Sequence, residues 1–213
     1  DKKHVKRDIQ KGQLFTNAGK TRFHCCLCFF VTAMTLDTTT ANLGALWVGI
    51  ELTTLASAPL IYFHRHQSSM EATWKYLMIC SVGIALALLG NILMSVAFHH
   101  PAVASPEGMD QLSAFMEKAR GIQGTDRVLW LKAAFIFLLV GYGTKMGLSP
   151  LHTWLPDAHS QAPSMVSGLL SGALLNCALL GILRGHQIMR AAGLGDFSGG
   201  LLVFFGLARM ITG

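Results

Sequence analysis

Long apolar runs recur along this chain and restrict what it can fold into. About twenty consecutive apolar residues are needed for a helix to cross the roughly 30 Å hydrocarbon core of a bilayer. The longest runs occupy 43–63, 76–98, 129–148 and 164–183. A shorter run covers 23–36, and another begins at about 200–213. Only 13% of the 213 residues are charged, whereas ordinary globular domains have roughly 25%. The sequence therefore predicts an all-α, polytopic membrane helix bundle.

Basic residues are concentrated at the start of the chain. Seven of the 17 lysines and arginines lie within residues 1–22. A basic arm can bind nucleic acid, but beside a spanning helix it more often marks the cytoplasmic flank. We therefore expect 1–22 to be a cytoplasmic connection to a single membrane domain over 23–213. Counting membrane crossings places the segments 64–75 and 149–163 on the same side of the membrane as residues 1–22. We expect no nucleic-acid partner.

The cysteines and the known cofactor motifs give little support for redox chemistry on this chain. Cys25, Cys26 and Cys28 lie in an apolar run and have no second C-x-x-C after them, so they are interpreted as small buried hydrophobes. Walker A, dinucleotide-binding, c-type haem and serine-triad motifs do not occur. We expect no bound cofactor, no metal and no catalytic residue in this chain. Because it starts without Met and ends in an apolar run, we expect a fragment of a longer protein.

Two ionisable residues of opposite sign lie inside different apolar runs. Glu51 is near the middle of 43–63, and Lys145 is in the second half of 129–148. Ionisable residues are costly in a bilayer and are functional-site candidates by default. Burial disfavours an ammonium and a nearby carboxylate favours it, so moving the partner would switch the lysine between holding and releasing a proton. A static ion pair that holds two helices in register is the alternative, and the residues alone leave both open.

A second lysine, Lys132, precedes Lys145 by 13 residues in the same run. The separation is about 20 Å along a straight helix. Lys132 could mark a second level of one polar path, or its side chain could extend to the membrane interface.

The segment LHTWLPDAHSQAP places two histidines around an aspartate. His152 and His159 are seven residues apart, with Asp157 between them. Two histidines that bind one metal from a single helix usually stand at i and i+4, and two prolines interrupt the segment. The pattern instead predicts a polar lining beside a broken helix, because discontinuous membrane helices leave polar groups where ions pass.

Three smaller patterns concern packing and turns. Ser167/Ser171 and Gly168/Gly172 have the small-xxx-small spacing that predicts close helix approach in a bilayer. Residues 37–42, DTTTAN, are expected to form a polar turn, and a short surface helix is expected at about 109–120.

The stretch from Lys145 to Arg184 closely resembles the signature of the antiporter-like membrane subunits. This family occurs in respiratory complex I, multisubunit cation/proton antiporters and membrane-bound NiFe hydrogenases of group 4. The segments WVGIELTTLASAPLI and EATWKYLMICSVGIALALLG are similar to the family's glutamate helix and to the helix after it. Within this family, the sequence looks most like the hydrogenase-4 component F branch. The segments that carry this resemblance are IELTTL, EATWKY, GYGTKMGL and LLNCALLGILR. The resemblance covers about 23–213.

The resemblance implies a fold with two inverted five-helix repeats, of which this chain would hold most of the first, truncated, and the start of the second. It implies that Glu51 is the acidic partner of the central Lys145, which would lie on a discontinuous helix. The resemblance also implies that His152, Asp157 and His159 lie in the loop and helix that follow Lys145. Lys75 matches a lysine often found at the start of the intervening helix.

One residue departs from the family pattern. Several relatives have a lysine in the helix after HTWLPDAH, where this chain has Asn176 in LLNCALL. An amide can pass a proton through hydrogen bonds or water but cannot hold one near neutral pH. The proton route is therefore expected to differ there or to use water.

Taken with the resemblance, three functions remain. The first is an ion-translocating subunit (H⁺ or Na⁺) of a respiratory-type oxidoreductase in the inner (plasma) membrane. It would contact other membrane subunits and a peripheral redox arm, where iron–sulfur clusters with NiFe or flavin are expected. The second is a subunit of a cation/proton antiporter without a redox partner. The third is a scaffold whose buried charges only hold helices in place.

Overall fold

The computed structural model describes residues 18–64, 67–98, 111–122 and 124–212, and within these ranges the chain is helical apart from its turns. The elements, in chain order, are α2 (Ala18–Thr39), α3 (Leu43–Ile61), η1 (Tyr62–His64), α4 (Gln67–Phe98), α5 (Leu112–Arg120), α6 (Thr125–Met146), α7 (Trp154–Gln161), α8 (Ser164–Leu169), the π-helical η2 (Leu170–Leu174), α9 (Leu175–Ala191) and α10 (Gly195–Thr212). The all-α fold class predicted from the sequence is confirmed.

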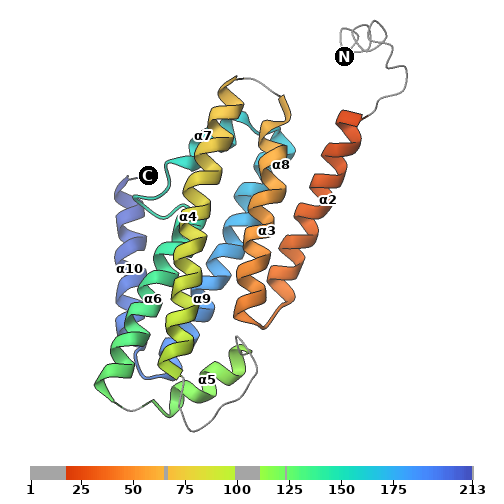
Figure 1. Cartoon of the computed structure of the whole chain (residues 1–213). Helices are drawn as coiled ribbons and strands as arrows, with labels where there is room; N and C mark the ends of the chain where they lie inside the picture. Colours follow the sequence, from red (N-terminus) through yellow and green to blue (C-terminus); the bar gives the residue numbers. More distant parts are fainter. Residues whose placement is uncertain (1–17, 65–66, 99–110, 123, 213) are drawn as a thin grey trace, which may run out of the picture.

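The long helices run side by side as one bundle, and the short helices lie at its ends (Figure 1). Helix α5 crosses one end, where the backbone N–H of Leu112 donates to the carbonyl of Ala41 at 3.0 Å, and it corresponds to the short helix expected at about 109–120. Helix α7 lies at the opposite end. Among the described residues, four helices or helix runs are long and apolar enough to cross a membrane: Leu43–Ile61, Gln67–Phe98, Thr125–Met146 and Ser164–Ala191.

Helix α2 is longer at both ends than the apolar run 23–36. Residues 18–22, expected in the cytoplasmic connection, form its start, whereas residues 1–17 lie outside the described part of the chain. The polar turn expected from residue 37 begins only after Thr39. Threonine hydroxyls within α2 donate to carbonyls three or four residues earlier, for example Thr35 to Thr32 at 2.7 Å, which lets polar residues remain helical. Asp37 is consequently a helical residue with a buried side chain.

The Gly/Pro-rich stretch after Lys145 ends one helix and redirects the chain. Gly147 adopts a left-handed conformation (φ 78°, ψ 38°), and the N–H of Leu148 donates to the carbonyl of Gly143 at 2.8 Å. This is the Schellman arrangement that closes helix C-termini. Further on, Pro163 excludes the α conformation for Ala162, which is extended (ψ 146°) and separates α7 from α8. The predicted helix break therefore lies directly behind Lys145.

Close helix approach occurs at α4 and α6 and not at the small residues expected to provide it. A Cβ atom added at Gly168 or Gly172 would meet nothing within 4 Å among the described residues, so this prediction was wrong for the chain as described. A Cβ at Gly141 of α6 would instead lie 2.5 Å from the amide nitrogen of Ala87 and 2.6 Å from the carbonyl oxygen of Gly83, both on α4. The absence of side chains there lets the two backbones touch.

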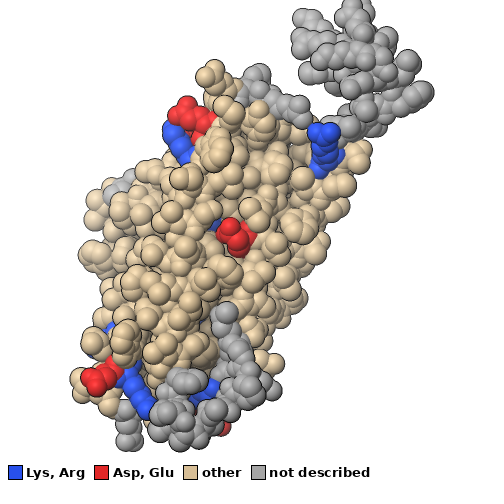
Figure 2. All heavy atoms as spheres, viewed as in Figure 1, with Lys and Arg blue, Asp and Glu red and all other residues tan. Residues whose placement is uncertain are grey.

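Charged side chains on the face shown in Figure 2 gather toward the two ends of the bundle. The broad band between them is largely uncharged, with one acidic group near its middle. Such a distribution fits a bilayer, because charged groups are stable at the interfaces and costly in the hydrocarbon region.

Candidate functional site

Lys145 is fully buried in the last turn of α6, with none of its surface exposed. Its Nζ donates to Thr54 Oγ1 at 2.7 Å and to Tyr76 OH at 2.6 Å. The same Nζ lies 4.6 Å from the centre of the Tyr76 ring, a distance at which a cation is attracted by an aromatic face. An unpartnered buried ammonium costs several kcal/mol. The contacts from α3 and α4 therefore stabilise the buried ammonium of Lys145.

Tyr76 connects the lysine to a chain of buried hydroxyls. Its OH also shares a 2.7 Å hydrogen bond with Ser57 Oγ. Its ring packs against Trp154, with centroids 5.0 Å apart. The indole N–H of Trp154 in turn donates to the carbonyl of Thr144 at 2.9 Å, so the start of α7 is tied to the residue beside Lys145. Hydroxyl groups both donate and accept, and the chain Lys145–Tyr76–Ser57 can therefore pass a proton.

Glu51 lies on α3 one turn before Thr54, on the same face of the helix. Its side chain is half-buried, and its Oε2 is enclosed without a hydrogen-bond partner. The ion pairs within 4.0 Å among the described residues all involve Lys75, so Glu51 and Lys145 do not form a direct ion pair here, and the role of Glu51 as the acidic partner stays a prediction. Glu51 interacts with Lys145 electrostatically, whereas Thr54 on the same helix makes the direct hydrogen bond to Lys145. A water molecule or a side-chain rotation would be needed to bring the two together.

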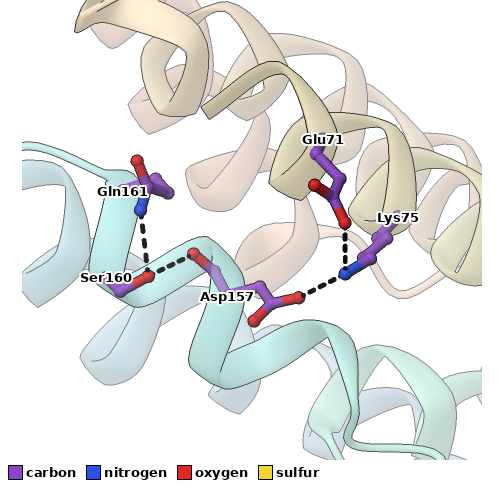
Figure 3. A network of polar contacts seen from close by, with 5 residues as sticks. All are labelled: Glu71, Lys75, Asp157, Ser160 and Gln161. Atoms are coloured by element: carbon purple, nitrogen blue, oxygen red, sulfur yellow. Dashed lines mark hydrogen bonds and ion pairs between the residues drawn. The ribbon is translucent and has the colours of Figure 1, made fainter. Parts of the chain in front are cut away.

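Lys75, next to Tyr76 in the chain, faces outward at the α7 end of the bundle. Its Nζ lies 2.9 Å from Glu71 Oε1 and 3.1 Å from Asp157 Oδ2 (Figure 3). Ser160 and Gln161 extend this network along α7 (Figure 3). The Glu71–Lys75 pair has the favourable i, i+4 spacing seen in the sequence. The side chains of Lys75 and Asp157 are 49% and 44% exposed, so two of the expected site residues meet at the surface, away from the buried lysine.

The two histidines of the HTWLPDAH segment have different surroundings. His159 Nδ1 shares a 2.8 Å hydrogen bond with Ser167 Oγ, which links α7 to α8. Burial lowers the pKa of His159 below its ordinary value of 6.5, so the ring is neutral at pH 7. His152 lies in the turn before α7 and has a buried Nδ1 without a partner. Neither histidine contacts Lys145 directly among the described interactions.

Lys132 and Asn176 lie apart from the buried lysine. Lys132 is half-buried, and its Nζ is 5.2 Å from the centre of the Phe197 ring on α10. Asn176 is exposed, and its amide donates to the carbonyl of Gly172 on its own helix. Asn176 therefore makes no contact with Lys145 among the described interactions.

Sequence reasoning missed the hydroxyl groups of Thr54, Ser57 and Tyr76. Thr54 and Ser57 follow Glu51 at intervals of three, which places all three residues on one helical face, and this spacing was the available signal. Tyr76 carried no such signal, because an aromatic residue at the start of an apolar run is typical of a membrane interface.

Comparison with known proteins gives the family. The model for the transmembrane domain of NADH:quinone oxidoreductase and Mrp antiporter subunits matches residues 40–213. The chain is 37% identical over 210 residues to a hydrogenase-4 component F homolog of Methylacidiphilum infernorum, covering 98% of this chain and 43% of that protein. It is 32% identical over 176 residues to NADH-quinone oxidoreductase subunit N of Deinococcus radiodurans, covering 81% and 33% respectively. The chain thus spans less than half the length of these relatives.

A solved structure agrees with the fold. A chain of respiratory complex I from Thermus thermophilus with bound aureothin superposes with a TM-score of 0.60 at 20% identity, over 90% of this chain and 51% of that one. At this identity the likeness concerns the fold alone. The family model, which matches most of the chain, together with the relatives above, shows that this chain belongs to the antiporter-like membrane subunits of the NADH:quinone oxidoreductase/Mrp antiporter family.

Proposed function

We propose that this chain is part of an ion-translocating membrane subunit that couples electron transfer in a respiratory-type oxidoreductase to proton movement, with sodium as the alternative ion. The observation that supports this most is the fully buried Lys145, which binds two hydroxyls and has no carboxylate of the described residues within 4.0 Å. A lysine that is held by neutral groups, with Glu51 nearby, can lose and regain its proton as the carboxylate approaches or recedes. A static ion pair would instead be expected to be in direct contact.

The relatives support a redox complex as the setting. Those named above are a hydrogenase-4 component and a quinone oxidoreductase subunit, and a hydrogenase-4 component B from Escherichia coli is 28% identical over 173 residues. We propose that the subunit lies in the inner membrane beside other membrane subunits. The iron–sulfur clusters, with NiFe or flavin, would be held by a peripheral arm. The electron path and the ion path would then be in different chains.

The test is Lys145→Met in the full-length subunit within its complex, because methionine fills a similar volume without a charge. Everted membrane vesicles should retain assembled complex and lose proton uptake driven by electron transfer. Lys118→Ala, which removes an exposed lysine on α5, should leave uptake unchanged. Undiminished uptake in Lys145→Met vesicles would refute the proposal and favour a scaffold role for the buried charges.

A cation/proton antiporter without a redox partner is the second candidate, because the matching family model includes Mrp antiporters. It predicts exchange of external Na⁺ or K⁺ for internal protons in vesicles that receive no electron donor. Exchange under those conditions that depends on Lys145 would favour the antiporter over the redox-coupled subunit.

A further inference from the structure

A second group of buried polar residues lies on α2, α4, α6 and α9, outside the Lys145 hydroxyl chain. Its members are Asp37, Asn91, Tyr142 and Arg184, and none has more than 8% of its surface exposed. Each has a buried side-chain atom without a hydrogen-bond partner in the part of the chain that the structure describes: both oxygens of Asp37, both amide atoms of Asn91, the hydroxyl of Tyr142 and Nη1 of Arg184. Buried polar groups in proteins are nearly always satisfied by protein or by ordered water.

Packing and charge place these residues near one another. A Cβ atom at Gly49 of α3 would overlap Oδ1 of Asp37, so the carboxylate is pressed against the backbone of α3. Asp37 interacts electrostatically with Lys145 and with Arg184, and Tyr142 interacts with Asp37 and Arg184. Asn91 on α4 is buried as well, and neither its amide nor the Tyr142 hydroxyl forms a hydrogen bond with a described residue.

Burial and the neighbouring charges act on the protonation of Asp37 in opposite directions. The titratable groups that act on it or that it influences are Lys145 and Tyr142 on α6 and Arg184 and Cys177 on α9. Burial favours the neutral acid, whereas the two cations favour the carboxylate. No ion pair within 4.0 Å joins Asp37 to either cation among the described residues. The balance between the acid and carboxylate forms of Asp37 therefore depends on the charge of Lys145.

The proton route was expected to differ from the family's at Asn176, and the position of these four residues bears on where it runs. Asn176 is exposed and bonded within its own helix. Arg184, two turns further along α9, is buried and electrostatically coupled to Asp37. A polar route through α9 would therefore pass Arg184 and not the position at which several relatives have a lysine.

We propose that Asp37, Asn91, Tyr142 and Arg184 line a hydrated relay beside Lys145, in which Asp37 is a second proton-exchanging carboxylate. The ammonium of Lys145 gives a proton through water to the carboxylate of Asp37, which yields a neutral amine and a carboxylic acid. Arg184 keeps its charge and stabilises the carboxylate when the proton leaves. This inference rests on the proposed function and adds to it a route through buried residues of α2 and α9.

The test compares Asp37→Asn with Lys145→Met in everted vesicles that contain the full complex, measuring electron transfer and proton uptake together. Asp37→Asn keeps the shape of the side chain and should lower uptake at least roughly ten-fold at unchanged complex content. Asp126→Asn, the same change at an exposed carboxylate in the first turn of α6, should have no effect. If Lys145→Met abolishes uptake and Asp37→Asn does not, the relay is refuted and the proposed function stands.

Arg184→Gln gives a second measurement that does not depend on Asp37→Asn assembling. Without the guanidinium the acid form of Asp37 is favoured up to a higher pH, so the pH profile of proton uptake should shift toward alkaline pH. An unshifted profile would refute the relay. Failure of both variants to assemble would also overturn it, because the residues would then act as a structural charge pair.

Discussion

Hydroxyl groups, and not a carboxylate, make the direct polar contacts of Lys145 among the described residues. Lys145 Nζ is held by Thr54 and Tyr76, and Tyr76 continues to Ser57 at 2.7 Å. Hydroxyls stabilise an ammonium without binding it as tightly as a carboxylate would. A lysine held in this way can change its protonation when Glu51 moves, whereas a lysine in a close ion pair would keep its proton.

Tyr76→Phe isolates the contribution of one hydroxyl. The ring contacts with Nζ and Trp154 are retained, while the hydrogen bonds to Lys145 and Ser57 are lost. A hydrogen bond to a charged group contributes about 1.5–3 kcal/mol, so proton uptake should fall roughly 10- to 100-fold if that energy appears in the transfer barrier. The measurement is uptake in everted vesicles at matched complex content.

The control for this change is Tyr62→Phe, which removes the hydroxyl of an exposed tyrosine in η1. It should leave proton uptake at the wild-type level. Equal uptake in wild type and Tyr76→Phe would show that the hydroxyl chain is not part of the ion path.

At the level of elements, the contact of α4 with α6 brings Tyr76 and Lys145 together. Gly83 and Gly141 let the two helices touch through their backbones, and a Cβ at Gly83 would lie 2.7 Å from Cβ of Thr144, the residue before Lys145. The Schellman closure at Gly147 then turns the chain so that Trp154 packs on Tyr76. The site is thus held from both sides of the break.

Gly141→Ala should force α4 and α6 apart. The added methyl group would meet backbone atoms of α4 at 2.5 and 2.6 Å, and backbone cannot move aside as a flexible side chain can. Overpacking of this kind typically costs about 1–3 kcal/mol. We expect a clearly lower midpoint of thermal unfolding in detergent. The measurement is the loss of the helical circular dichroism signal with temperature.

Gly168→Ala is the matched change on α8, where an added Cβ would meet nothing within 4 Å. It should raise stability slightly, by roughly 0.5–1 kcal/mol, because alanine favours a helix over glycine. If the two variants unfold at the same temperature, the α4–α6 contact does not carry the stability assigned to it here.

For the whole molecule, the two ends of the bundle are different. One end has α7 with the Lys75 network, and the other has α5 and the start of α10 (Figure 1). A broad, largely uncharged band lies between the two ends (Figure 2). The distribution of lysine and arginine along the sequence predicts that the α7 end is cytoplasmic.

Cysteine labelling tests this orientation. In a full-length protein whose native cysteines are replaced, the Ser160→Cys variant on α7 should react with a membrane-impermeant maleimide in everted vesicles only. The Lys118→Cys variant on α5 should react in right-side-out preparations only. Both side chains are exposed, so the reagent can reach them. Labelling of both positions from one side would contradict the membrane-spanning arrangement.

The sequence alone determined the all-α fold class, the two charged residues within apolar runs and the helix break after Lys145. These follow from local properties: apolar length sets which segments can span a bilayer, and Gly147 with Pro163 ends helices wherever they occur. The Glu71–Lys75 ion pair is local in the same sense, because a helix brings residues four apart onto one face.

Only the tertiary structure decided which partner each buried charge has. Tyr76 and Thr54 reach Lys145 from helices 69 and 91 residues away in the chain, and Asp37 became buried because α2 continues past its apolar run. The small residues that pack were at Gly83 and Gly141 and not at Gly168 and Gly172. Contacts of this kind depend on the rotation of one helix against another, which the periodicity of a single segment cannot specify.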